Sequence, residues 1–421
     1  MVRSEPGERE PLSSQFGLLS CPRDRKGMSR VAAFRTALVI LASLAAAKLA
    51  DELLRLAWRS GPTAAIDLEL RYAEVQAWFA GARVYETMRA AVYPPATYPL
   101  LWPFLGWLDL EPARWLWAAA TALALAVTVW IAVRESGAGA WDRRAFAGLL
   151  VLAPNETGVA LGNGQLIPLV LPALLAGLLL MHRGRGSWPK DVGAAACMIF
   201  ALVKVTLAVP FLWVVLLAAA PDEPTAARSL RLRPVALIAA GYAALTWFAL
   251  AFQPAPWGAH LRAWLRLARD VAVKGGNYAD VHAWLAAAGL PSLILPASAA
   301  LFLALGVWMF AHRHVDLWLR LGVTALVARF WTYHRLYDDM LVVIALLALL
   351  RMTGLSDSLA QRRLAGVLLA ITLSTMLLPA RLGTAPLSWR LVFTGGHTLA
   401  WLAVLGYLIA AARTAPRQMD A

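Results

Sequence analysis

Apolar stretches long enough to cross a bilayer recur along most of this 421-residue chain, and this recurrence limits its fold more than any other feature. Hydrophobic residues make up 60% of the sequence and charged residues only 15%, which is too little polar material to cover a water-soluble surface. Within hydrocarbon every backbone amide must be paired inside its own segment, so an open sheet is excluded. The sequence therefore predicts an all-α, polytopic integral membrane protein.

The positions of Arg and Lys predict how the chain crosses the membrane, because short cytoplasmic loops carry an excess of these residues. We expect about twelve transmembrane helices with both termini cytoplasmic. The expected spans are about 32–57, 112–133, 145–161, 165–182, 234–252, 293–311, 316–330, 337–350, 364–379 and 391–411, with two short helices in 192–220 that meet near Lys204.

The two ends of the chain are predicted to be polar tails that flank a single domain. Residues 1–30 are charged, aperiodic and rich in Pro, Gly and Ser, which predicts a disordered cytoplasmic tail in which Met28 is a candidate start. A single transmembrane domain is expected over residues 31–412 and a second cytoplasmic tail over 413–421. The formal net charge of +14 is explained by cytoplasmic loops, so no nucleic-acid partner is inferred.

The first outer loop, residues 60–111, carries the most informative polar group. Residues 66–90 are amphipathic and predict a helix on the membrane surface, and residues 95–108 predict a second surface or re-entrant helix. Asp67 is a candidate general base for a transfer to a hydroxyl group, since a carboxylate in hydrogen-bond reach can take the hydroxyl proton. The alternative is a solvated carboxylate that caps the helix after it. Glu69 and Glu74 are weaker candidates.

Other unusual polar residues are expected at the same outer side. Lys204 interrupts a long apolar run, so its ammonium group should pair, line a cavity or extend to the membrane surface. The Asn163-Gly164-Gln165 segment predicts a tight turn between helices whose amide side chains could face a sugar. His334 and Arg335 lie in a polar segment between two spans and are candidates to bind a phosphate group.

The sequence lacks the residue patterns of disulfide frameworks, metal sites and nucleotide-binding loops. Cys21 and Cys197 are the only cysteines and predict neither a disulfide framework nor a metal cluster. No His, Asp, Glu or Cys spacing indicates a metal site, and no Gly-rich loop of the nucleotide-binding kind is present. We therefore expect no cofactor, no catalytic metal and no cytoplasmic nucleotide-sugar site.

In their order along residues 30–411, these motifs resemble those of the polytopic GT-C glycosyltransferases, and most closely glycosyltransferase family 87, the polyprenyl-phosphate-mannose-dependent α-mannosyltransferases. The residues that carry the resemblance are Asp67, Gly81, Tyr85, Tyr93-Pro94-Pro95, Gly162-Asn163-Gly164-Gln165, Lys204 and His334-Arg335-Leu336-Tyr337-Asp338. Two features depart from the family pattern: the proline after the lysine is displaced to Pro210, and Asn277-Tyr278-Ala279-Asp280 stands where Asn followed by Ser is usual.

The resemblance implies a GT-C-like fold in the cell membrane with an active site on the non-cytoplasmic face. It implies inverting transfer of a sugar, with mannose favoured, from a polyprenyl phosphate to a glycan or glycolipid acceptor, with Asp67 as base. The residues implied to bind the donor are Lys204, His334, Arg335, Tyr337, Asn163 and Gln165, and those implied to support the site are Tyr85, Tyr93 and Asp338.

Two other functions are compatible with the sequence. A transporter or flippase of a lipid-linked or small anionic substrate would place its charges near the bilayer midplane, often in repeated halves. A lipid-linked glycan ligase would carry a large outer loop rich in Arg and His, whereas residues 253–292 have the arginines but only two histidines, His260 and His282.

Overall fold

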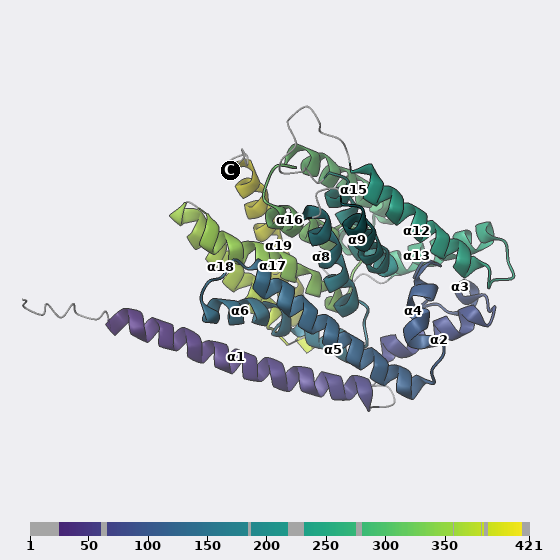
Figure 1. The fold of residues 1–421 in the computed structure, drawn as a ribbon, viewed down its shortest axis with the longest axis horizontal. Coiled ribbons are helices and arrows are strands. Elements are labelled where there is room, and N and C mark those ends of the chain that lie inside the picture. The colour runs from purple at the N-terminus through teal and green to yellow at the C-terminus, as the bar shows by residue number, and fades with distance from the viewer. Residues whose placement is uncertain are drawn as a thin grey trace, which may run out of the picture.

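The computed structural model describes residues 25–59, 65–183, 187–217, 231–274, 280–356, 358–379, 381–382 and 386–414. Within these ranges the chain is helical and forms no strand, which confirms the all-α class (Figure 1). The predicted tails lie outside the described residues, except that the first helix already begins at Arg25 and the last one ends at Thr414.

The helices, with η for a 3₁₀ helix, are α1 (Arg25–Ala57), α2 (Ile66–Phe79), α3 (Val84–Thr87), α4 (Thr97–Leu105), α5 (Leu110–Glu135), α6 (Trp141–Leu152), α7 (Asn155–Gly162), α8 (Ile167–Arg183), α9 (Trp188–Ala201), η1 (Leu202–Lys204), α10 (Val205–Ala208), η2 (Val209–Phe211), α11 (Leu212–Leu216), α12 (Leu232–Leu250), α13 (Trp257–Lys274), α14 (Val281–Ala287), η3 (Pro291–Leu293), α15 (Ile294–Ala311), α16 (Leu317–Phe330), η4 (Leu336–Val342), α17 (Val343–Leu355), α18 (Leu359–Met376) and α19 (Leu387–Thr414).

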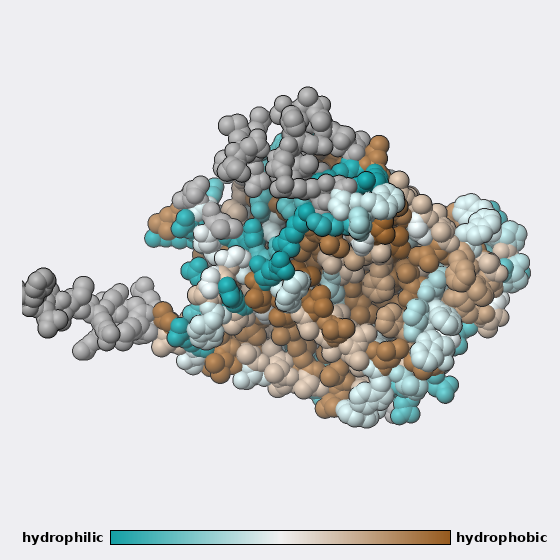
Figure 2. Space-filling view, in the orientation of Figure 1, coloured by the Kyte–Doolittle hydropathy of each residue, from teal (hydrophilic) through white to brown (hydrophobic). Residues whose placement is uncertain are grey.

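Five helical runs among the described residues are long and apolar enough to cross a membrane, and a bent pair makes a sixth. The five are 110–135, 188–216, 232–250, 291–311 and 388–414. Large apolar side chains on these runs are exposed, including Leu123, Trp247, Leu295, Val307 and Leu399. Figure 2 shows a hydrophobic area in the middle of one face, with hydrophilic residues toward its upper edge and at the α2–α3 end. This distribution is that of a membrane protein, because lipid covers apolar side chains that water would expose.

The expected total of about twelve spans is not confirmed, since only five runs, or six with the bent pair, are long and apolar enough among the described residues. Two regions also differ in shape from the prediction. The span expected at 145–161 is two helices, α6 and α7, bent by 49°. Pro154 lies at the break, where its own backbone leaves helical geometry with a ψ of 141°, and a proline has no N–H group to continue the helical hydrogen bonds. The region expected to be two short helices does leave helical geometry at Lys204, but residues 188–216 as a whole are long enough for a single crossing.

The first outer loop folds into short helices rather than one surface helix. α2 ends at Phe79, and Gly81 adopts a φ of 79°, which turns the chain before α3. α2 is well covered, since Leu68, Val75 and Trp78 are buried. α4 packs against α2 and occupies the segment expected as a second surface or re-entrant helix. α13 and α14 occupy the later outer loop, in which no helix was predicted, and Asn277–Ala279 between them lie outside the described residues.

The turn at Gly164, which connects α7 and α8, packs closely against α2, and a substitution at this glycine tests that packing. Gly164 has a φ of 67°, and an added Cβ would lie 2.5 Å from the Cβ of Leu68. Both the left-handed backbone and the overlap oppose a side chain, so Gly164→Ala should lower the free energy of unfolding by about 2–5 kcal/mol. Gly139→Ala is the matched control because its Cβ would meet nothing within 4 Å. Thermal unfolding in detergent measures both, and equal midpoints would contradict this packing.

Candidate functional site

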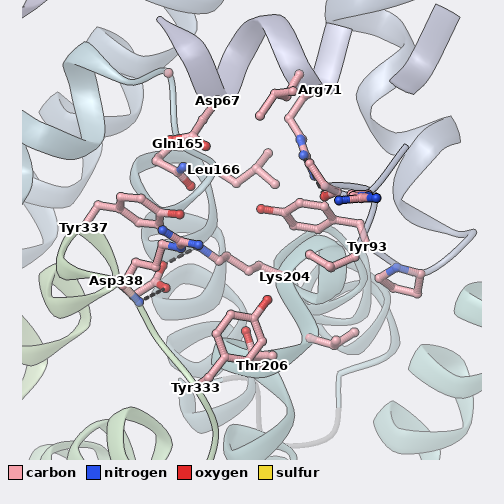
Figure 3. Close-up of a pocket in the computed structure, with 18 residues that line it drawn as sticks. Asp67, Arg71, Tyr93, Gln165, Leu166, Lys204, Thr206, Tyr333, Tyr337 and Asp338 are labelled. Carbon is pink, nitrogen blue, oxygen red and sulfur yellow. Dashed lines mark hydrogen bonds and ion pairs between the residues drawn. The ribbon is translucent and has the colours of Figure 1, made fainter. Parts of the chain in front are cut away.

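Five segments that are distant in sequence surround one cavity of about 420 Å³. They are the start of α2, the irregular stretch 89–94, the turn 164–166, the broken helix at 204–206, and residues 333–338. Figure 3 shows Asp67 and Gln165 on one side of the cavity, Tyr337 and Asp338 below them, Arg71 and Tyr93 opposite, and Lys204 between. Seven of the ten residues proposed from the sequence line this cavity: Asp67, Tyr93, Gln165, Lys204, Arg335, Tyr337 and Asp338.

Lys204 reaches the cavity because the helix breaks at this residue. Its backbone has φ −116° and ψ 79°, outside helical geometry. Pro210 lacks an N–H group, so the Thr206 carbonyl loses its usual helical partner and accepts a bond from Trp331 Nε1 at 2.8 Å instead. Thr97 Oγ1 donates to the Val203 carbonyl at 3.1 Å. Side chains from other segments thus satisfy the carbonyls that the break leaves free, as an apolar surrounding requires.

The ammonium group of Lys204 is paired. It forms a buried ion pair with Asp338 Oδ1, and its Nζ lies 4.8 Å from the centroid of the Tyr337 ring. The ion pair joins residues that are 134 positions apart. It therefore fixes the broken helix against the 333–338 segment on one wall of the cavity.

Asp67 lies in the first turn of α2, where the helix dipole favours a negative charge. The α2 cap is not made by this side chain, so the capping alternative does not apply. The Leu68 amide donates to the Asn163 carbonyl at 3.2 Å, which ties the start of α2 to the turn that carries Gln165. Glu69 faces α5 instead, with its Oε1 3.9 Å from Arg114 Nη1. Asp67 is thus the α2 carboxylate presented to the cavity.

Arg71 and Arg89 also line the cavity, and sequence reasoning missed both. Arg71 is four residues after Asp67 on α2 and is buried, with its Nη2 2.6 Å from Glu74 Oε1 and its guanidinium 4.5 Å from the centroid of the Tyr93 ring. Burial raises the pKa of Glu74 to about 7; Arg71 opposes this shift and Asp67 adds to it. The i, i+4, i+7 spacing of Asp67, Arg71 and Glu74 was the available signal, since it places all three on one helix face.

Asp280 and His282 accept hydrogen bonds from the backbone of the segment that contains Tyr333 and Arg335. Asp280 Oδ2 accepts from the His334 amide at 3.3 Å, and His282 Nδ1 accepts from the Tyr333 amide at 3.2 Å. The other ring nitrogen of His282 lies 2.6 Å from Ser298 Oγ, which itself donates to the Ile294 carbonyl. His282 Nε2 must therefore be the protonated nitrogen and Nδ1 the acceptor, which defines a neutral ring.

Three sequence-predicted residues do not face the cavity. Asn163 Oδ1 accepts from Arg55 at 2.7 Å, so this side chain points to α1. His334 is fully buried, with Nε2 2.8 Å from the Ala328 carbonyl and Nδ1 3.4 Å from Asp338 Oδ2. Tyr85 donates to the Tyr93 carbonyl at 2.7 Å. His334 and Tyr85 thus position cavity residues, whereas Asn163 fixes the turn.

Comparison with known proteins assigns no family, because no protein-family model, curated protein or solved structure matches the chain. In the described part of the chain, no group of three or more His, Cys, Asp or Glu side chains is arranged to hold a metal ion.

The cavity brings together an acidic side chain, basic side chains and several neutral polar ones. No hydrogen bond or ion pair within the described residues occupies the Asp67 carboxylate. Lys204 and Arg335 line the cavity with positively charged side chains, and Gln165, Thr206, Tyr333 and Tyr337 add polar groups of the kind that bind hydroxyl-rich ligands. An anion would be held by the cations while a nearby hydroxyl gives its proton to Asp67.

The support that His282 gives to the 333–338 segment predicts a pH dependence. Burial, with a contribution from His334, lowers the pKa of His282 from 6.5 to about 4. Below pH 6.5 the unfolded chain binds a proton that the folded chain does not, so stability should fall as the pH drops from 6.5 to about 4. In His282→Gln, which keeps an acceptor and a donor but cannot titrate, this loss should be smaller. Thermal unfolding over this pH range tests it, and equal slopes for both proteins would refute it.

Proposed function

We propose that this protein is an inverting glycosyltransferase that moves a sugar, with mannose favoured, from a polyprenyl phosphate to a glycan or glycolipid. The observation that carries the proposal is the single cavity that joins Asp67 to Lys204 and Arg335. Proximity of a base and an anion-binding group is what transfer from a sugar phosphate needs. The resemblance of the motif order to glycosyltransferase family 87 supports the same reaction.

In the proposed reaction Asp67 accepts the proton of the acceptor hydroxyl as its oxygen attacks the anomeric carbon of the donor. The bond between this carbon and the phosphate oxygen breaks on the opposite face of the sugar, which inverts the configuration. The leaving polyprenyl phosphate gains negative charge, and Lys204 and Arg335 stabilise it. Asp338 holds Lys204 in place for this step, and Gln165 and Tyr337 contact the sugar.

The proposal also includes how the chain crosses the membrane. About twelve crossings with both termini cytoplasmic put α2 and the 333–338 segment on the non-cytoplasmic side of the cell membrane. A donor held in that leaflet by its lipid tail would reach the cavity by lateral diffusion. Confinement to the membrane supplies part of the proximity that a soluble enzyme obtains by binding.

A transporter or flippase is the second candidate, and one observation favours it. Ionisable side chains are buried inside the helical bundle: Arg329 pairs with Asp339, and Glu156 Oε1 lies 3.6 Å from His397 Nε2. Buried charges of this kind line ion or substrate pathways in transporters. Supplying the purified protein with polyprenyl-phosphate mannose, glucose and arabinose in parallel separates the two functions. A transferase forms a glycosidic product in detergent, whereas a transporter only moves substrate across a vesicle membrane.

Asp67→Asn tests the base. Its amide cannot accept the hydroxyl proton at neutral pH, so the transfer rate should fall by about 10²–10⁴-fold while expression and thermal stability stay unchanged. Glu69→Gln is the matched control, because it removes the same charge from the same helix but points toward Arg114. Product formation from the best donor is the measurement. Turnover of Asp67→Asn equal to that of Glu69→Gln would remove Asp67 from the mechanism.

A further inference from the structure

A basic helix, α13, follows shortly after α12, which is one of the helices long and apolar enough to cross a membrane. Only residues 251–256 separate the two helices. With three arginines and one aspartate in residues 257–270, α13 carries too many charges to cross a bilayer itself. It therefore stays near the membrane surface at which α12 ends.

Exposed aromatic side chains mark this surface. At the end of α12 and just after it, Trp247 is 78% exposed and Phe252 is 40% exposed, and at the start of α13 Trp257 is 61% exposed. Tryptophan in particular gathers where the hydrocarbon of a bilayer meets the lipid headgroups. These aromatic residues place the start of α13 at that depth of the membrane.

One face of α13 packs against the protein. His260 and Ala263 are buried, and Leu267 packs against the hydrophobic core. Trp264 Nε1 donates to the Val92 carbonyl at 2.8 Å, which fixes the helix to a segment that lines the cavity. At the end of the molecule that holds α3, α13 contacts α3 and α14 (Figure 1). These contacts fix the direction in which the other faces of α13 point.

The outward surface of α13 has an apolar part and a cationic part. Trp257 and Leu265, which is 52% exposed, belong to the apolar part. Arg262, Arg266 and Arg269 are exposed, and their i, i+4, i+7 spacing places them in one row along the helix, beside Leu265. This division fits a helix that lies in the membrane plane, with its apolar side chains toward hydrocarbon and its basic ones among the headgroups.

The protein does not neutralise this row of arginines. Within the described residues, no ion pair or side-chain hydrogen bond engages Arg262, Arg266 or Arg269. Asp270, on the same helix, is exposed and forms no ion pair with them there. Guanidinium groups bind phosphate oxygens through parallel hydrogen bonds, so three of them at headgroup depth provide a site for lipid phosphates.

We propose that the row Arg262, Arg266 and Arg269 on α13 binds the headgroups of anionic phospholipids. The phosphates accept hydrogen bonds from the guanidinium groups, while Trp257 and Leu265 enter the edge of the hydrocarbon. Because α13 is bonded to the cavity segment through Trp264, bound lipid also stabilises that segment. This inference concerns the membrane surface of the protein and does not depend on glycosyl transfer.

Quenching by brominated lipids tests the site in the full-length protein. Cys21 and Cys197 are replaced by serine, and a bimane fluorophore is attached to Leu265→Cys. The protein is reconstituted into vesicles of equal parts phosphatidylglycerol and phosphatidylcholine, in which only one of the two lipids has brominated chains. Phosphatidylglycerol should be enriched about 5-fold or more around the label, the effect of one basic residue at an anionic surface. Quenching should therefore be stronger when this lipid carries the bromine.

Two sets of variants assign the preference to the arginines. The triple substitution Arg262→Gln, Arg266→Gln and Arg269→Gln should make quenching by the two lipids equal. The triple substitution of the same residues by lysine should keep part of the difference, because the positive charge remains. Leu303→Cys is the matched label position, since Leu303 is 59% exposed on α15, a span candidate whose own sequence has no charged residue. A label there should be quenched equally by both lipids.

Three results would overturn the inference. Equal quenching of the Leu265→Cys label by both lipids, with the arginines intact, would show that α13 lies in the membrane without selecting anionic lipid. No quenching by either lipid would show that this face meets water or a partner protein instead. A preference for phosphatidylglycerol that survives the triple glutamine substitution would assign it to other cationic groups.

Discussion

The ion pair between Lys204 and Asp338 is the interaction on which the cavity depends. An ammonium group in an apolar segment is costly unless it is paired, and breaking a buried pair costs about 3–5 kcal/mol. The pair holds a broken helix against a segment 134 residues later in the chain. The other carboxylate oxygen of Asp338 contacts His334, which is fully buried, so the ion pair is also connected to a buried side chain.

The rest of the cavity is held together around this pair by hydrogen bonds to backbone groups of the segments that line it. The Asn163 carbonyl receives the first turn of α2, Asp280 and His282 hold the 333–335 backbone, and the Thr206 carbonyl is bound by Trp331. Irregular backbone in an apolar protein is stable only when its polar groups are satisfied. The site is found where several such irregular segments meet.

Sequence reasoning located most of the long apolar helices and most of the cavity because both depend on local patterns, whereas α13 and α14 were not predicted and the expected twelve spans are not reached among the described residues. Apolar runs predicted the helical segments, and a lysine inside one of them predicted the break at Lys204. The bend between α6 and α7 followed from Pro154 and was missed. The direction of single side chains could not be predicted: Asn163 and His334 point away from the cavity because of contacts with Arg55 and with the Ala328 carbonyl, which exist only in the folded chain.

The most direct test of the account is an experimental structure in a lipid nanodisc with a non-hydrolysable donor, in which a phosphonate replaces the phosphate of polyprenyl-phosphate mannose. If the proposed mechanism is right, the phosphonate lies within hydrogen-bond distance of Lys204 or Arg335, and the anomeric carbon of the sugar faces Asp67. A phosphonate bound elsewhere, or packed side chains that separate Asp67 from Lys204, would contradict it.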